Sequence, residues 1–376
     1  MNNSGKHTSR QDPVRYGRHL ALPEIGIQGQ KAISRARVLI IGAGGLGCPV
    51  IQYLAAAGVG TLGIADNDVV EVSNLQRQVL YGDSDVGKLK AIRAGARAAS
   101  LNPAGTFNLI TSRITAENVL EVIPDYDIVV DCTDNFPTRY LLNDACVLQD
   151  KTFVYGSVYR FEGQVSVFNA LLKDTQRGPN YRDLFPEPPP ADLLPDCSQA
   201  GVIGCLPGII GSVQAMEVIK IITGAGQPLS GRLFIFDSLT METRSITIAD
   251  QKTRNSITEI KQQETPDSDS NTNNLISPLL LKNWITDTRS FELLDVREPF
   301  EREIVSLGGK AIPLGQLETK AHELPVDRPL VVYCKSGGRS AQAIQTLTGL
   351  GFGNLYNLEG GILAWIREVD PELPGY

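Results

Sequence analysis

The stretch from Val38 to Gly47 reads VLIIGAGGLG, and it constrains the fold of this chain more than any other. Its four apolar residues predict a short buried strand, and the glycines that follow (Gly42, Gly44, Gly45 and Gly47) open a helix. Glycines at such a turn let the backbone approach a phosphate, and the free N–H groups at the helix start then face it. The pattern predicts a Rossmann-like nucleotide site without choosing between a mononucleotide and a dinucleotide.

Size and composition narrow the class of protein. A chain of 376 residues with 42% hydrophobic and 20% charged residues is typical of roughly two to three globular domains. Its net charge of -7 argues against nucleic acid as the main partner. We see no apolar run near the roughly 18 residues of a spanning helix, so no membrane partner is expected. A polar N-terminus and scattered cysteines without a C-x-x-C pair predict a cytoplasmic protein.

The residues after the glycines favour a triphosphate. Asp66 ends the next predicted strand, about twenty positions on, where such folds hold ribose hydroxyls. The polar segment that follows offers Asn74, Arg77, Gln78 and Lys90. Arginine binds phosphate through a planar fork and lysine through a mobile point charge. The alternative of an NAD-dependent dehydrogenase would account for the glycines and Asp66 but would give Arg77 and Lys90 no role.

Four other residues also allow a structural interpretation when they are taken alone. Asp134 and Asn135 follow the strand DIVVD, where a carboxylate can bind Mg²⁺ beside a triphosphate, but a DN pair can equally cap a helix. Arg18 fits a solvated basic helix face. Cys197 lies in a long Pro-rich loop and can be either a thiolate nucleophile or a small buried apolar residue.

A second, smaller α/β unit is expected at residues 278–376, after a polar linker at 251–277. Its sharpest feature is YCKSGGRS, in which Cys334 ends a buried strand and Arg339 opens the next helix. Loop N–H groups, the helix start and Arg339 would all stabilise an anion, which predicts a reactive thiolate or persulfide carrier. A phosphatase is the alternative, but the four residues between Cys334 and Arg339 make a shorter loop than dual-specificity phosphatases use.

The first unit resembles the MoeB/ThiF/HesA family, the bacterial relatives of ubiquitin-activating enzymes. The motifs that carry the resemblance cover about residues 10 to 248; they are RYGRHLALPEIG, GAGGLG, DNDVVEVSNLQRQ, VGKLKA, DCTDNFPTR, EGQVSVF, CSQAGVIGCLPGIIG and QAMEVIK. The second unit resembles a rhodanese domain through LLDVREPFE, VVYCKSGGRS and LEGGILAW. The pairing of both units resembles molybdopterin-synthase sulfurylases. The expected organisation is therefore a disordered segment 1–9, an adenylation domain 10–250 with a mixed sheet, the linker 251–277 and a rhodanese domain 278–376.

The resemblance implies an adenylyltransferase and sulfurtransferase that uses ATP and Mg²⁺. Its substrate would be the C-terminal glycine of a small ubiquitin-like sulfur carrier protein ending in Gly-Gly, which would become a thiocarboxylate. Asp134 would bind the metal, Arg18 would reach into the site of the other subunit of a homodimer, Cys197 would capture the activated carboxyl, and Cys334 would carry persulfide sulfur. The remaining candidate residues would hold the nucleotide; they are the four glycines, Asp66, Asn74, Arg77, Gln78, Lys90 and Asn135.

The sequence departs from the family at the zinc ligands, and it leaves the sulfur donor and the pathway open. Many relatives bind zinc through two C-x-x-C pairs, but Asn180 and Asp183 stand where the first pair would fall, so we expect no zinc and a region held by packing alone. The sulfur donor (thiosulfate or a cysteine desulfurase) and the pathway (molybdopterin, thiamin, cysteine, tRNA thiolation or a secondary metabolite) cannot be read from the sequence. An adenylation-only activator with a regulatory or redox-sensing rhodanese domain is the alternative function, and a degenerate scaffolding protein is a third.

Overall fold

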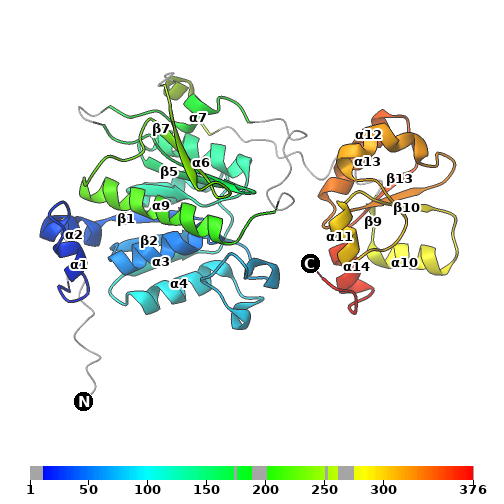
Figure 1. Ribbon diagram of the computed structural model, residues 1–376, viewed down its shortest axis with the longest axis horizontal. Coiled ribbons are helices and arrows are strands. Elements are labelled where there is room, and N and C mark those ends of the chain that lie inside the picture. Colours follow the sequence, from blue (N-terminus) through cyan, green and yellow to red (C-terminus); the bar gives the residue numbers. More distant parts are fainter. Residues whose placement is uncertain (1–11, 173–175, 189–200, 250–252, 261–274, 376) are drawn as a thin grey trace, which may run out of the picture. The chain divides into compact units, whose positions relative to one another are not determined.

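The computed structural model describes residues 12–172, 176–188, 201–249, 253–260 and 275–375 (Figure 1). The chain divides into two compact units, Met1–Gln263 and Glu264–Tyr376, and each is described by itself. The segment 1–9, which we expected to be disordered, lies outside the described residues. Cys197 lies outside them too.

The first unit is built on one eight-stranded sheet, in the order β3-β2-β1-β4-β5-β6-β7-β8. The first five strands along the chain pair in parallel, and the last three continue the sheet in antiparallel fashion. This confirms the predicted mixed sheet. The strands are β1 (Arg37–Ile41), β2 (Thr61–Ala65), β3 (Thr106–Ile110), β4 (Ile128–Asp131), β5 (Thr152–Tyr159), β6 (Glu162–Phe168), β7 (Arg232–Asp237) and β8 (Glu242–Thr247).

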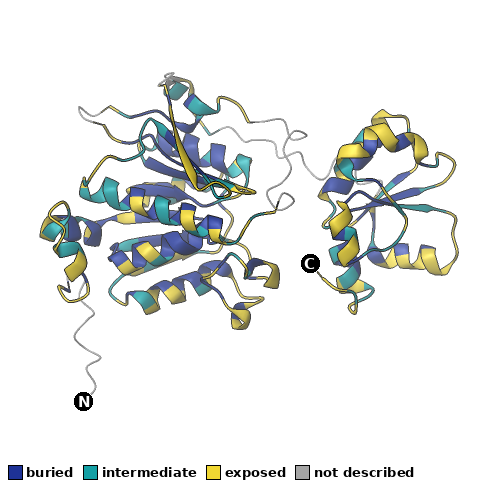
Figure 2. Ribbon diagram, in the orientation of Figure 1, coloured by how far each residue is buried: buried dark blue, intermediate teal, exposed yellow. Residues whose placement is uncertain are grey.

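The central strands are buried, and Figure 2 shows them in dark blue. Apolar side chains lie on both of their faces. In β1, Val38 and Ile40 join one buried cluster and Leu39 and Ile41 join the other, because successive side chains of a strand point to opposite faces. The first cluster packs against α3 (Gly47–Ala57), α4 (Lys90–Leu101) and α9 (Cys205–Thr223), and the second against α5 (Val119–Val122), α6 (Phe136–Leu148) and α7 (Tyr181–Leu184). The remaining helical segments are α1 (Gly17–Leu20), α2 (Gly26–Arg35), η1 (Val72–Asn74), η2 (Asp83–Asp85), η3 (Ile123–Asp125) and η5 (Thr253–Ser256).

Helix α9 corrects one expectation from the sequence. Within the described residues it is long and apolar enough to cross a membrane by length and composition, with a mean hydropathy of 1.5, although we expected no such stretch. A helix that is apolar on all sides is also typical of a protein core. Here α9 packs between α3 and strands β5 and β6, and its buried residues include Leu206, Ile210 and Val218. Its composition is therefore explained by its place in the first unit.

The second unit has a five-stranded parallel sheet in the order β11-β10-β12-β13-β9. Helices cover both faces, and each face has its own buried cluster. The strands are β9 (Leu275–Ile276), β10 (Glu292–Asp295), β11 (Lys310–Ala311), β12 (Leu330–Tyr333) and β13 (Leu355–Leu358). The helices are α10 (Pro278–Thr286), α11 (Pro299–Ile304), η7 (Leu314–Gln316), α12 (Leu317–Lys320), η8 (Ala321–Glu323), α13 (Gly338–Gly349) and α14 (Gly361–Glu368).

The two ends of the predicted linker 251–277 belong to the units instead. Near its start, Thr253 lies in η5 and donates its hydroxyl to Asp183 Oδ1 at 2.8 Å. Asn180 Nδ2 lies 2.8 Å from the Thr253 hydroxyl and 2.9 Å from Asp183 Oδ2. At the other end, β9 is an edge strand of the second sheet. The region that we expected to be held by packing alone is therefore held by a buried hydrogen-bond cluster.

Candidate active sites

The glycine-rich turn lies directly against the turn that follows β4. Gly42 has a φ of +93°, and a Cβ there would come within 2.6 Å of the Cys132 carbonyl oxygen. A Cβ on Gly47 would overlap the Gly42 carbonyl oxygen. Both positions therefore require glycine: Gly42 because the two turns are in backbone contact, and Gly47 because the glycine-rich turn folds against its own backbone. The close packing brings the predicted phosphate-binding turn beside the strand end that carries Asp134.

Asp66 is tied to the glycine-rich turn by backbone hydrogen bonds. Its Oδ2 accepts the Ala43 N–H at 2.7 Å, and its Oδ1 accepts the Asp68 N–H at 2.9 Å. Burial raises the pKa of Asp66 above its usual value, although both backbone N–H groups act in the opposite direction. Each carboxylate oxygen can accept a second hydrogen bond, so Asp66 can hold ribose hydroxyls while it fixes the turn.

The predicted phosphate-binding residues surround the same turn. Lys90 is the first residue of α4, and its Nζ donates to Asp68 Oδ2 at 3.1 Å with only 8% of the side chain exposed. Arg77 donates through Nη1 to the Ser73 carbonyl at 2.9 Å. Asn74 is buried and its Oδ1 accepts the Glu71 N–H, so its amide oxygen closes a local turn. Lys90 is thus held near the turn by a carboxylate, and Arg77 by a backbone carbonyl.

Gln78 differs from these residues because its side-chain oxygen lacks a hydrogen-bond partner among the described residues. It is 4% exposed, and its Oε1 has no hydrogen-bond partner within the described part of the chain. A Cβ on Gly44 would lie 3.5 Å from Gln78 Nε2, so the amide sits against the glycine-rich turn. Buried polar atoms are nearly always paired in native proteins. An unpaired amide oxygen at this point is consistent with the predicted nucleotide contact.

The two residues of the DN pair after β4, Asp134 and Asn135, have different environments. Asn135 Oδ1 accepts the Thr138 N–H at 3.0 Å and caps α6. Asp134 is exposed, and it makes no hydrogen bond or ion pair with any residue that the structure describes. The turn between β4 and Asp134 is braced by the buried Asp131, whose Oδ1 accepts the Thr133 N–H and whose Oδ2 accepts Arg139 Nε. Asp134 is therefore presented on a rigid turn.

This arrangement fits a metal ion that arrives with a nucleotide. The described residues contain no group of three or more His, Cys, Asp or Glu side chains that could hold an ion by themselves. Magnesium usually takes one or two protein carboxylates and completes its shell with water and phosphate oxygens. Asp134 could supply one such carboxylate, and the phosphates would have to supply the rest.

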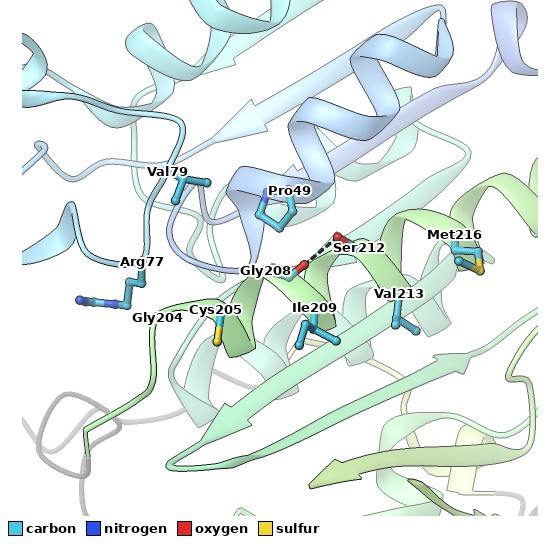
Figure 3. A pocket seen from close by; sticks show the side chains of 10 residues that line it. All are labelled: Pro49, Arg77, Val79, Gly204, Cys205, Gly208, Ile209, Ser212, Val213 and Met216. Carbon is cyan, nitrogen blue, oxygen red and sulfur yellow. Dashed lines mark hydrogen bonds between the residues drawn. The ribbon is translucent and has the colours of Figure 1, made fainter. Parts of the chain in front are cut away.

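An apolar groove opens beside this site (Figure 3). It has a volume of about 530 Å³, and Arg77 and Cys205 lie on its wall. Cys205 is exposed at the start of α9 and was given no role in the sequence analysis; the relevant signal was its place one residue after a glycine at a helix start. The other side chains along the groove are mostly apolar; they include Pro49, Val79, Ile209, Val213 and Met216.

Arg18 lies apart from these residues in its own chain. It is exposed on α1, which packs against α2, and no hydrogen bond or ion pair joins it to another described residue of the chain. The helix itself is anchored, because His19 Nδ1 lies 2.8 Å from Gln30 Oε1 and Tyr16 is buried. The geometry leaves the Arg18 side chain available to another molecule.

In the second unit, donors converge on the sulfur of Cys334. The residue directly follows β12 and is 1% exposed. The Gly337 N–H donates to its Sγ at 3.1 Å, and the Ser340 hydroxyl lies 3.4 Å from it. Gly337 has a φ of +102°, a left-handed conformation that turns this N–H toward the sulfur, and α13 begins at the next residue. Loop N–H, hydroxyl and helix start are therefore placed to stabilise a thiolate or persulfide.

Arg339 has a different environment from the one we expected. Its Nη1 donates to Glu301 Oε2 at 2.6 Å and its Nη2 to Glu301 Oε1 at 2.7 Å. Both residues are buried, so the carboxylate offsets the positive charge that we assigned to the sulfur. A bidentate pair of this kind fixes the start of α13 against α11. A catalytic role for Arg339 stays a prediction, while its structural role is visible in these contacts.

Comparison with known proteins assigns both units. The ThiF family model matches residues 16–257, and the rhodanese-like domain model matches residues 277–368. This chain belongs to the ThiF family. It is 44% identical over 378 residues to the probable adenylyltransferase/sulfurtransferase MoeZ of Mycobacterium tuberculosis, covering 98% of this chain and 96% of that protein. The predicted family and two-domain resemblance are thereby confirmed.

Other relatives of this ThiF family member match one unit or both. Adenylyltransferase and sulfurtransferase MOCS3 of Xenopus laevis is 40% identical over 404 residues, covering 97% of this chain and 88% of that protein. The sulfur carrier protein adenylyltransferase of Thermus thermophilus is 49% identical over 240 residues, or 64% of this chain and 89% of that protein. The crystal structure of E. coli MccB shares the fold, with a TM-score of 0.55 at 23% identity over 66% of this chain and 72% of that chain.

Proposed function

We propose that this protein adenylates the C-terminal glycine of a small ubiquitin-like sulfur carrier protein and then converts it to a thiocarboxylate with sulfur carried on Cys334. The observation that carries the proposal is the contact between the glycine-rich turn and the turn of Asp134, in a chain that also holds a donor-lined cysteine loop. Relatives over nearly the full length are named adenylyltransferase and sulfurtransferase, and one is named for a sulfur carrier protein.

The first step joins the carrier carboxylate to the α-phosphorus of ATP. A carboxylate oxygen attacks, pyrophosphate leaves, and an acyl adenylate forms. Because a carboxylate is a weak nucleophile, the rate must come from positioning and from neutralising phosphate charge. Asp66 would orient the ribose, while Arg77 and Lys90 would bind phosphate oxygens. Mg²⁺ on Asp134 would supply further charge neutralisation when it is bound.

The second step moves sulfur to the activated carbonyl. The terminal sulfur of a Cys334 persulfide attacks the carbonyl carbon, and the bond from that carbon to the AMP oxygen breaks. The carrier is then held to Cys334 through an acyl disulfide. A second thiol attacks Cys334 Sγ, so that the thiocarboxylate leaves and a disulfide remains for a thiol reductant. Cys197 is our candidate for this second thiol or for an earlier covalent adduct with the carrier.

Replacing Ser340 with alanine should slow sulfur transfer by roughly tenfold, because one donor to the sulfur is lost while the Gly337 N–H remains. Thiocarboxylate formation from the preformed acyl adenylate measures the effect. Thr348→Ala, which removes a hydroxyl from the same helix away from the sulfur, serves as the matched control. An unchanged rate in Ser340→Ala would assign Ser340 a packing role.

Three further features belong to the same proposal. A homodimer would bring Arg18 of one subunit to the nucleotide of the other, which the exposure of Arg18 and the apolar groove along α9 support. The sulfur donor would be thiosulfate or the persulfide of a cysteine desulfurase. The protein would act in the cytoplasm, since its cysteines carry no disulfide among the described residues.

The test is ATP–pyrophosphate exchange with a panel of ubiquitin-like carriers that end in Gly-Gly. Exchange that depends on one carrier supports adenylation and identifies the pathway. Binding of ATP without exchange on any carrier would contradict the carrier as the acyl substrate. A protein that does not bind ATP at all would overturn the assignment of the first unit and leave only the chemistry of Cys334.

A further inference from the structure

A buried tyrosine holds the glycine-rich turn from its inner side. The Tyr81 hydroxyl donates to the Ala43 carbonyl at 2.7 Å, and Tyr81 is only 7% exposed. Ala43 is the second residue of the GAGGLG turn and is completely buried. Since a buried phenol nearly always needs a hydrogen-bond partner, this contact also fixes the ring. No role was assigned to Tyr81 from the sequence, because nothing in its local pattern pointed to a carbonyl 38 residues away.

Both polar groups of Ala43 are therefore held by side chains. Its N–H donates to Asp66 Oδ2 at 2.7 Å, on the side where the ribose is expected, and its carbonyl accepts from Tyr81. Two short hydrogen bonds on the same residue set the orientation of the peptide groups on either side of it. The N–H groups of Gly44 and Gly45 follow directly, and their direction depends on that orientation.

Tyr81 also joins this turn to the segment of the predicted phosphate ligands. Its own N–H donates to the Gln78 carbonyl at 3.1 Å, so it follows Arg77 and Gln78 within one turn of backbone. Its hydroxyl lies 3.4 Å from the Lys90 carbonyl at the start of α4. Through its phenol and its backbone N–H, Tyr81 thus contacts three segments that would surround a triphosphate. Burial raises the pKa of Tyr81 well above its usual value, so its hydroxyl stays protonated as a donor.

We propose that Tyr81 is a positioning residue for the nucleotide step, because its hydroxyl orients the Ala43 peptide so that the following N–H groups face the phosphates. The proposal rests on the proposed function, since it assumes a nucleotide phosphate at this turn. Tyr81 does not touch the substrate. It acts through the backbone of Ala43 and through its contacts with the segments of Gln78 and Lys90.

The test is Tyr81→Phe, which keeps the ring and removes one oxygen. Among the described residues, the Ala43 carbonyl then keeps only the weak Cys48 thiol at 3.6 Å as a donor. We expect the affinity for ATP, measured by calorimetry, to fall by on the order of tenfold, since a buried acceptor loses its donor. The affinity for adenosine should change by less than about twofold, because adenosine has no phosphate and still reaches Asp66.

Tyr140→Phe is the matched control. Tyr140 is completely buried in the other core cluster of the same unit, and its hydroxyl donates to the Glu187 carbonyl at 2.7 Å. It should lose a similar amount of thermal stability and keep both affinities. Equal losses of ATP affinity in the two variants, or unchanged ATP affinity in Tyr81→Phe, would overturn the proposal. The ratio of the ATP affinity to the adenosine affinity is measured without a carrier protein. Failed pyrophosphate exchange in the parent protein would therefore count against the proposed function, while the test of Tyr81 could still be interpreted.

Discussion

Replacing Cys334 with alanine should abolish thiocarboxylate formation and leave ATP–pyrophosphate exchange at the parent rate. Cys334 is the residue on which the donors of its loop converge, and removing a nucleophile that carries a covalent intermediate costs on the order of 10³-fold or more. The glycine-rich turn, Asp66 and Asp134 all lie in the other compact unit, which has its own buried cores. The two steps should therefore fail independently.

Ser336→Ala is the matched control for this prediction. Ser336 is exposed in the same loop, and the hydrogen bonds to the sulfur come from Gly337 and Ser340 instead. It should retain both activities. Thiocarboxylate formation that persists in Cys334→Ala would favour the adenylation-only alternative, with sulfur arriving from elsewhere. Loss of pyrophosphate exchange in the same variant would refute the model of two separable sites.

A reducible covalent adduct with the carrier would be a third step, which can be distinguished from adenylation and from sulfur transfer. Cys197→Ala should remove such an adduct if that residue captures the activated carboxyl. Cys205 is the competing thiol, because it is exposed on the groove beside Arg77. Comparing single Cys197→Ala and Cys205→Ala variants by non-reducing electrophoresis assigns the adduct to one of them, and an adduct that survives in Cys197→Ala would contradict our assignment.

The local elements of the first unit could be predicted because their signals are local. The run VLII became β1 and the glycines became a turn that leads into α3, as the pattern indicated. Asp66, which directly follows the second strand, accepts a hydrogen bond from the turn, and its contact with a ribose stays a prediction. These features depend on side-chain periodicity and on the steric freedom of glycine, and both can be recognised within a short stretch of sequence.

The contacts that were missed join residues far apart in the chain. Glu301 pairs with Arg339 across 38 positions, and Thr253 reaches Asp183 across 70. Local pattern cannot reveal such partners, because pairing depends on which helices and loops the topology brings together. The same limit applies to Tyr81 and to α9, whose apolar sequence does not distinguish a buried core helix from a spanning one.

Replacing Asp134 with asparagine should reduce pyrophosphate exchange by on the order of 10²–10³-fold without destabilising the fold. Asparagine keeps the size of the side chain but removes the charge that a divalent cation needs. Asn135, not Asp134, caps α6, so the helix keeps its first hydrogen bond in the variant. Asp134 is also exposed and unpaired within the described residues, so its loss should change the free energy of unfolding by less than about 0.5 kcal/mol.

The dependence on Mg²⁺ separates a metal ligand from a residue that only shapes the turn. If Asp134 binds the ion, the Mg²⁺ concentration for half-maximal exchange should rise in Asp134→Asn, and excess Mg²⁺ should restore part of the activity. Glu121→Gln, an exposed charge removal on α5, should leave both values unchanged. A loss of exchange at every Mg²⁺ concentration, together with a lower melting temperature, would instead assign Asp134 to the rigid turn that Asp131 and Arg139 already brace. Because those two residues stay intact, the variant isolates the contribution of a single carboxylate.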